Sequence, residues 1–172
     1  MRLTLGIAAL AATMAVATPA FAQTVTANAT AEARGVVLLP LTLTKTSDVD
    51  FGTVIASTTV AGSVTIDPDT GARSVSGGVL GVPTYPGGRG LFQGAGTVGN
   101  DVILTLNAPT VLTSGANIIN VSSFVLDNGG ATTRTIDATG AFAVGVGGTF
   151  DIVAAQPNGL YTAQFDLTAE YQ

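Results

Sequence analysis

The chain has 172 residues, of which only 10% are charged, and it contains no His, Cys or Trp. Without His and Cys it lacks the commonest general base, the thiolate nucleophile and the usual zinc and copper ligands, so composition argues against an enzyme and predicts no cofactor or metal. The formal net charge of −5 disfavours nucleic acid as a partner.

The first 22 residues have the pattern of a secretory signal peptide. A basic start at Arg2 precedes the apolar run Leu3–Val16, and Ala20–Ala22 ends the segment in an A-x-A pattern. The run falls short of the roughly 20 residues that a membrane-spanning helix needs. We therefore expect export through the periplasm and a mature chain, residues 23–172, that does not span the membrane.

Residues 23–35 form an amino-terminal extension with regular alternation of apolar and polar side chains. The apolar face consists of small residues: Val25, Ala27, Ala29, Ala31 and Ala33. Alternation with period two is typical of a β-strand with one buried face. The same parity continues to Leu43, but Pro40 lacks an amide hydrogen and therefore favours an edge strand, a bulge or a switch between sheets.

Residues 36–172 show repeated period-two alternation and no convincing helical periodicity, which predicts one all-β domain. Turn chemistry predicts hairpins at Asp67–Gly71 and at Asn128–Gly130. Seven glycines and two prolines in residues 81–99 predict a long surface loop with a short strand at Leu91-Phe92. The other predicted strands are residues 50–55, 62–66, 72–79, 101–107, 119–126, 132–138, 141–144 and 149–154. Many short strands at this spacing favour a β-sandwich.

The carboxyl-terminal segment alternates again and begins with a glycine. Its apolar face includes Tyr161, Phe165, Leu167 and the penultimate residue Tyr171, and Gly159 is the fourteenth residue from the end. This combination resembles the terminal strand of chaperone-usher pilins.

A second resemblance covers other parts of the domain. Thr44–Val54, with Asp50-Phe51-Gly52-Thr53 inside it, is similar to an early segment of spore coat protein U-like and related pilin domains. Gly147–Thr149 and Gln156–Tyr161 are similar to the closing half of the same group. Unlike many classical pilins, this chain has no cysteine pair, so it resembles a cysteine-free branch of secreted domains of unknown function.

The resemblance implies both a fold and a function. The fold would be an immunoglobulin-like β-sandwich of pilin type that lacks one strand and is completed by a donor strand. The protein would be a structural subunit of a cell-surface fimbria, a homopolymer helped by a periplasmic chaperone and an outer-membrane usher. The five small apolar residues of the extension would form the donor strand, and Gly159, Tyr161, Phe165, Leu167 and Tyr171 would belong to the terminal strand that contacts the chaperone.

Two other functions compete with this one, and two motifs imitate ligand sites. A self-complete sandwich, in which residues 25–33 pair within their own chain, would be a monomeric adhesin or carbohydrate-binding module. A hydrolase would need a pair of positioned carboxylates, for which Asp48 and Asp50 are weak candidates. Gly94–Gly99 fits the G-x-G-x-x-G pattern of dinucleotide-binding loops, but no βαβ unit surrounds it, so a flexible glycine-rich loop is favoured. Asp67–Gly71 imitates a calcium loop, but position twelve is Gly78 instead of Glu.

Signal removal is directly testable. We expect the exported protein to begin at Gln23, because Ala20 and Ala22 provide the small residues that signal peptidase requires. Intact-mass measurement of the protein collected outside the cell checks this, and a mass that still includes Met1–Ala22 contradicts it.

Overall fold

The computed structural model describes residues 26–172, so the predicted signal peptide and Val25 lie outside the described residues. The chain divides into two units, Met1–Gly35 and Val36–Gln172. Within the first unit, residues 26–35 are exposed and carry no strand. In the described part of the chain, no helix is long and apolar enough to cross a membrane.

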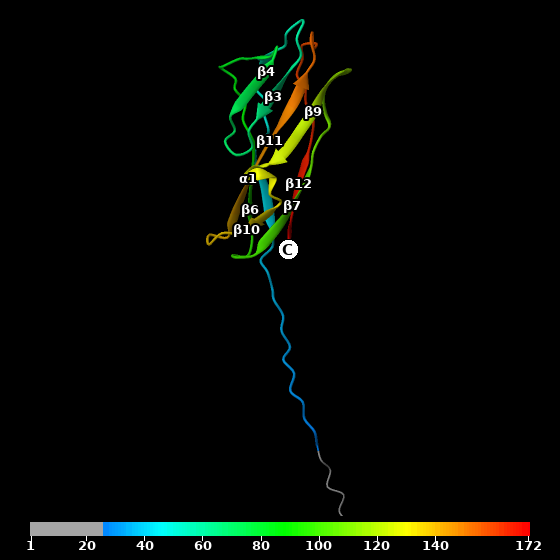
Figure 1. Cartoon of the computed structure of the whole chain (residues 1–172). Helices are drawn as coiled ribbons and strands as arrows, with labels where there is room; N and C mark the ends of the chain where they lie inside the picture. The colour runs from blue at the N-terminus through cyan, green and yellow to red at the C-terminus, as the bar shows by residue number, and fades with distance from the viewer. Residues whose placement is uncertain (1–25) are drawn as a thin grey trace, which may run out of the picture. The chain divides into compact units, whose positions relative to one another are not determined.

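The second unit is built almost entirely of β-strands, which confirms the all-β prediction (Figure 1). The strands are β1 (Thr42–Ser47), β2 (Val54–Ile55), β3 (Gly62–Ile66), β4 (Arg73–Gly77), β5 (Leu80–Gly81), β6 (Gly90–Ala95), β7 (Asp101–Asn107), β8 (Val111–Ser114), β9 (Asn117–Leu126), β10 (Thr133–Thr135), β11 (Ala141–Ile152) and β12 (Asp166–Tyr171). A single helical turn, α1 (Asp127–Gly130), follows β9.

The strands form three antiparallel sheets, one of them curled into a half-barrel. The largest has the order β1-β6-β11-β3-β4, and it also includes β9, which pairs with β11, and β8, which pairs with β9. A second sheet has the order β10-β7-β12, and β2 pairs with β5 in a short ribbon. Strand β1 is an edge strand with a register shift between Lys45 and Ser47, which fits the edge and bulge options that Pro40 suggested.

The β3–β4 hairpin forms where the turn chemistry predicted it. Asp67 accepts hydrogen bonds from the backbone N–H groups of Asp69 and Thr70, and Gly71 takes a φ of 76° that favours glycine. These hydrogen bonds, chiefly those from Thr70, lower the pKa of the Asp67 carboxyl. The alternation of β3 then buries Val64 and Ile66 completely.

The prediction of a hairpin at Asn128–Gly130 is wrong. The chain does reverse there, with positive φ at Asn128, Gly129 and Gly130. The flanking strands do not pair with each other, because β9 pairs with β8 and β11 whereas β10 pairs with β7 in another sheet. The turn therefore carries the chain from one sheet to the other.

Strand β11 is one continuous strand in place of the two predicted at 141–144 and 149–154. It pairs with β6 through its first half and with β3 and β9 through its second half. A Cβ at Gly147 would clash with the Ile66 carbonyl, and one at Gly148 would clash with the Ser123 carbonyl. These glycines interrupt the apolar alternation because neighbouring backbone lies against them.

The short strand predicted at Leu91-Phe92 is confirmed as part of β6, but the residues around it do not form a surface loop there. Strand β6 lies between β1 and β11 in the largest sheet, and Phe92 is buried. Gly94 has no room for a side chain because the Phe142 ring packs on it. Glycine here permits close packing within a sheet, so composition alone suggested the wrong structure.

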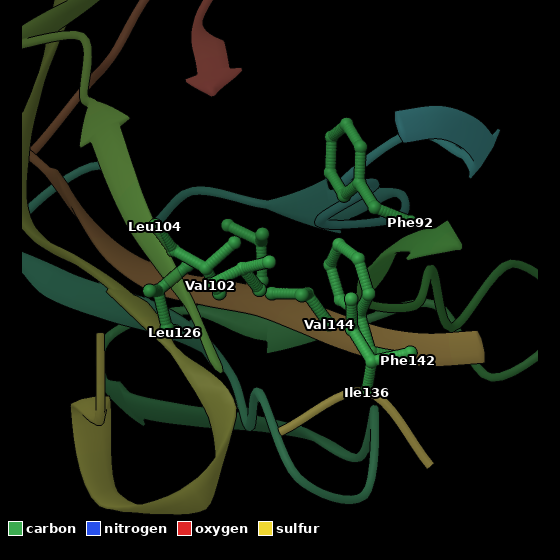
Figure 2. Close-up of a cluster of buried hydrophobic side chains, with 8 residues drawn as sticks. Phe92, Val102, Leu104, Leu126, Ile136, Phe142 and Val144 are labelled. Carbon is green, nitrogen blue, oxygen red and sulfur yellow. The ribbon is translucent and has the colours of Figure 1, made fainter. Parts of the chain in front are cut away.

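Two clusters of buried side chains form the core. The first lies between the largest sheet and β7, and Figure 2 shows most of its members. They are Phe92, Val102, Leu104, Leu126, Ile136, Phe142, Val144 and Val146. The second cluster fills the other part of the domain and contains Phe51, Val64, Ile66, Val79, Ile119, Phe150 and Ile152. The rings of Phe51 and Phe150 meet edge to face at 4.5 Å.

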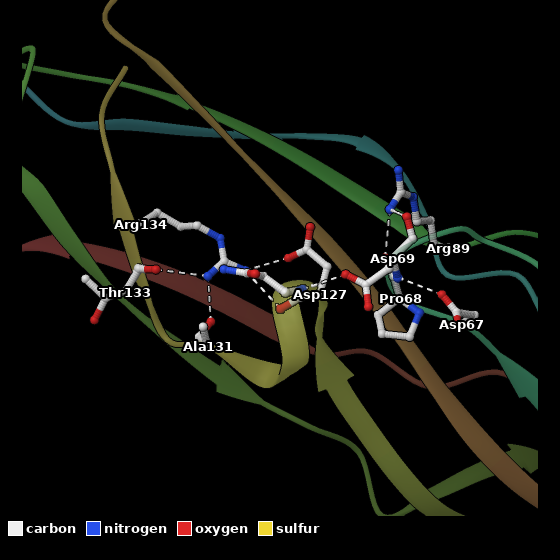
Figure 3. A network of polar contacts seen from close by, with 9 residues as sticks. Asp67, Pro68, Asp69, Arg89, Asp127, Ala131, Thr133 and Arg134 are labelled. Carbon is white, nitrogen blue, oxygen red and sulfur yellow. Dashed lines mark hydrogen bonds and ion pairs between the residues drawn. The ribbon is translucent and has the colours of Figure 1, made fainter. Parts of the chain in front are cut away.

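A polar network links α1 to the β3–β4 turn (Figure 3). The Arg134 guanidinium donates to the Asp127 carboxylate at 2.5 Å and to the carbonyl of Ala131 at 2.7 Å. Asp69 accepts a hydrogen bond from the Asn128 N–H, and Arg89 donates to the carbonyls of Pro68 and Asp69. The network satisfies backbone carbonyls where the chain leaves one sheet for the other.

We expect Arg134→Gln to lower the free energy of unfolding by about 3 kcal/mol. Only 11% of the Arg134 side chain and 21% of the Asp127 side chain are exposed, so loss of the guanidinium leaves a poorly solvated carboxylate. Arg34→Gln is the matched control, since its pair with Glu32 is 82% and 75% exposed and contributes about 0.5 kcal/mol or less. Urea unfolding of both variants measures the difference, and equal midpoints would contradict the structural role of Arg134.

Candidate functional site

Two strands of the domain lie at sheet edges and face each other. Strand β1 pairs only with β6, and β12 pairs only with β7, so within residues 26–172 the second edge of each strand has no partner. The two strands run in opposite directions. Tyr171, at the end of β12, lies beside Leu39, which precedes β1. Phe165, directly before β12, lies beside Phe92, which pairs with Lys45 in the second half of β1. We call the line between them the groove: both strands have an unpaired edge there, and the apolar side chains along it are only partly buried.

The groove widens into an apolar cavity of about 1170 Å³ at the end where β1 finishes and β12 begins. Its floor consists of Phe92, Leu112, Ile119, Phe150 and Ile152, contributed by strands of the largest sheet. Its walls are residues 48–56 on the β1 side and residues 156–166 on the β12 side. We call this wide end the mouth of the groove.

The apolar side chains that border the groove are only partly buried. On the β1 side these are Leu41, Leu43 and Val49, and on the β12 side they are Phe165, Leu167, Ala169 and Tyr171. All pack against the first core cluster, yet each keeps part of its surface open. The first cluster is therefore incompletely covered along the line between β1 and β12.

The opposite end of the groove is closed by the penultimate residue. The Tyr171 hydroxyl donates to the Leu39 carbonyl at 2.8 Å and accepts from the Thr97 N–H at 2.8 Å. The Leu39 N–H donates to the Thr97 hydroxyl at 2.7 Å, so three segments meet at this point. Gly96 makes room for the arrangement, because a Cβ there would clash with the Tyr171 hydroxyl. We call this set of contacts the clasp.

The structure brings some of the predicted terminal-strand residues together and separates others. Phe165, Leu167 and Tyr171 lie along one face, and the Phe165 ring meets Phe124 edge to face at 4.9 Å. Tyr161 lies outside β12; it packs against the second core cluster and donates to the Pro157 carbonyl. Gly159 lies at an exposed bend before the strand. The predicted terminal strand is therefore shorter than its alternation suggested.

The predicted donor residues remain outside the folded strands. Val25 lies outside the described residues, and Ala27, Ala29, Ala31 and Ala33 are exposed and belong to no strand. The first strand begins only at Thr42. Despite its alternation, the extension therefore pairs with no sheet within the described part of the chain.

The two ligand-like motifs have structural roles in this fold. Gly94–Gly99 runs from β6 into a turn without a following helix, and its first two glycines accommodate Phe142 and Tyr171. In Asp67–Gly71, the Asp67 carboxylate is occupied by backbone N–H groups of its own turn. Asp50 similarly accepts from the Gly52 N–H, and Asp48 pairs with Lys45 at 2.6 Å. No group of three candidate metal-ligating side chains occurs among the residues that the structure describes.

Sequence reasoning missed the β1 side of the groove and the floor of its mouth. Val49 and Phe51 lie within the Thr44–Val54 segment that suggested a family resemblance, but the spacing gave no sign that they border a cavity. Phe92 belongs to the short strand that the sequence predicted, but its glycine-rich surroundings gave no sign that it contributes to the floor. A clue was available in Leu41 and Leu43, which are large apolar residues in a strand predicted to lie at an edge.

Fold and groove together define a small all-β domain in which the unpaired edges of β1 and β12 lie beside each other, with an amino-terminal extension. Residues 41–171 match the model of the Domain of unknown function (DUF4402), and the chain belongs to this family. No curated protein and no solved structure gave a significant match.

We expect Tyr171→Phe to destabilise the domain by about 1 to 2 kcal/mol, because the Thr97 N–H loses a partner at a partly buried site and the Leu39 carbonyl loses one at an exposed site. Tyr85→Phe is the control, since 66% of Tyr85 is exposed. Thermal unfolding compares the two. Gly96→Ala offers an independent test because it displaces the same hydroxyl without removing it, and a clasp that carries no stability predicts no loss in either variant.

Proposed function

We propose that this protein is a structural subunit of a cell-surface fimbria, assembled by donor-strand complementation. The observation that carries the proposal is the groove between β1 and β12, with two unpaired strand edges over an incompletely covered core cluster. Cα atoms of β1 and β12 approach within 8 Å, so the two strands would move apart to admit one added strand, which would then pair with both edges and cover the exposed apolar surface. The domain is then an immunoglobulin-like sandwich of pilin type that lacks one strand.

The amino-terminal extension is the proposed donor. It alternates small apolar and polar residues, as a strand with one buried face does, and in the described residues it belongs to no sheet. A neighbouring chain would insert Val25, Ala27, Ala29, Ala31 and Ala33 toward the core, leaving the polar residues on the outer face. Small side chains suit a groove whose floor already holds large rings at Phe92 and Phe150.

Assembly of this kind produces a polymer. The donor lies at one part of the chain and the acceptor groove at another, so the contact is heterologous and need not close into a ring. Until a donor arrives, the open edges carry an aggregation hazard. A periplasmic chaperone that lends a strand, and an outer-membrane usher that exchanges it, are therefore the proposed partners, and the terminal strand with Phe165, Leu167 and Tyr171 is the proposed chaperone contact.

Deletion of Thr24–Arg34 tests the proposal. We expect the deleted protein to keep its domain, alone or chaperone-bound, and to stop polymerising, because residues 36–172 contain both core clusters and the extension lies outside them. Electron microscopy and size-exclusion chromatography measure the polymer. A replacement of Thr24–Arg34 by Gly and Ser at equal length is the control for chain length, and it should fail to polymerise in the same way.

A synthetic peptide of residues 24–34 provides the complementary measurement. A peptide that binds only the folded domain raises its melting temperature by mass action, so we expect a rise with the deletion protein. Filaments that persist after the deletion contradict donor-strand assembly through this segment. A deletion protein that stays unfolded even with the peptide favours the self-complete sandwich, in which residues 25–33 are an integral strand.

A further inference from the structure

The two ends of the groove differ, and this difference orients any strand that enters it. At one end the clasp joins Tyr171, Leu39 and Thr97 by hydrogen bonds of 2.7 to 2.8 Å. At the other end the mouth opens into the cavity of about 1170 Å³. In Figure 1 the carboxyl terminus, labelled C, lies at the clasp end of the domain, where the chain leads into β1.

A donor from a second copy of the chain remains joined to its own domain through Gly35 and Val36. Because the clasp closes one end of the groove, the joined side of the donor must leave through the mouth, and its free amino terminus must point toward the clasp. Such a donor runs antiparallel to β12, whose chain direction is from the mouth to the clasp. Because β1 runs opposite to β12, the same donor runs parallel to β1, so the clasp and not the pairing type sets its direction.

The rim of the mouth is apolar and exposed. Ile55 and Leu160 both line the cavity, with exposures of 57% and 82%. Leu80, which is 67% exposed, lies directly opposite Ile55 in the β2–β5 ribbon, and residues opposite each other in an antiparallel pair share a face. We call Ile55, Leu80 and Leu160 the rim.

The residues that follow the donor in sequence are equally apolar and exposed. Val36 is 86% exposed and Val37 is 95% exposed. Two adjacent valines with almost their whole surface in water have no packing role in their own domain. They are also larger than the described apolar positions of the donor, which are all alanine.

We propose that Val36 and Val37 of one chain pack on the rim, Ile55, Leu80 and Leu160, of the next chain in the polymer. This inference rests on the proposed function. The donor orientation brings this segment out through the mouth, and both surfaces are apolar and uncovered. Leu39 is fixed by the clasp of its own domain, so only Leu38 separates the rim-bound segment from that domain. Two residues of extended chain span about 7 Å, so consecutive domains lie close together.

The double substitution Val36→Ser and Val37→Ser in the full chain tests the inference. Both residues are exposed, so the unfolding midpoint of the monomeric domain should not change. We expect polymers to form and to dissociate at least about tenfold faster, because polar side chains forfeit the apolar burial at the rim. Val98→Ser, at a residue that is 53% exposed and belongs to neither surface, is the control and should leave the rate unchanged within about twofold.

Substitution of the rim identifies the partner surface. Leu80→Ser should speed dissociation as the valine substitutions do. When it is combined with Val36→Ser and Val37→Ser, it should add less than about twofold, because both changes remove the same contact. If the substitutions on the two surfaces instead multiply their effects on the dissociation rate, the two surfaces do not contact each other.

The outcomes separate this inference from the proposed function. Polymers that need Thr24–Arg34 but dissociate at the wild-type rate in the valine variant overturn the rim contact and leave donor-strand assembly standing. Polymers that form without Thr24–Arg34 overturn the proposed function, and the rim contact with it. The rim contact is supported if the valine variant and Leu80→Ser each speed dissociation and their combination adds little to either effect.

Discussion

The unpaired edges of β1 and β12 are the constraint on which the rest of this structure depends. Backbone N–H and C=O groups are obligatory hydrogen-bonding groups, and in a sheet they are normally satisfied by a neighbouring strand. Here the two sheets approach each other along β1 and β12 without pairing, while half-buried side chains such as Leu43 and Leu167 lie between them. The donor strand proposed above would join the largest sheet to the β10-β7-β12 sheet and complete the cover over the first core cluster.

Glycine provides the close approaches that make this geometry possible. At Gly94 the Phe142 ring lies against the backbone, and at Gly96 the Tyr171 hydroxyl does so. In β11, Gly147 and Gly148 leave room for the backbone carbonyls of Ile66 and Ser123 to lie against this central strand. Many glycines usually indicate a flexible chain, but at these positions the absence of a side chain allows other groups to pack against the backbone. The groove, the clasp and the central strand all depend on them.

Local interactions explain which parts of the fold the sequence predicted. The β3–β4 hairpin follows from Asp67 and Gly71, residues that fix their own turn, and β7 follows from alternation within seven residues. Of β6 only the short strand at Leu91-Phe92 was predicted, because the need for glycine at Gly94 comes from Phe142, far away in sequence. The Asn128–Gly130 turn was predicted, whereas the partners of its flanking strands were not, since pairing is decided by tertiary packing. For the candidate site, the carboxyl-terminal alternation identified Phe165, Leu167 and Tyr171, but the facing wall at residues 48–56 carries no pattern of its own.

For the proposed donor, the energetics of strand insertion indicate that its alanines would need help from other parts of the chain. Each buried methyl group contributes about 0.8 kcal/mol and each backbone hydrogen bond about 1 kcal/mol, while ordering costs about 1 to 2 kcal/mol per residue. Alanines alone therefore leave little net gain. Two further sources are available: apolar surface on the acceptor, where Leu43, Phe165 and Leu167 are only half covered, and the exposed valines that follow the donor. The half-covered acceptor side chains would stabilise the strand inside the groove, whereas Val36 and Val37 would stabilise the chain where it leaves through the mouth. A strand of small residues can then slide into the groove without large side chains passing the floor, and the larger residues at the mouth would slow its escape.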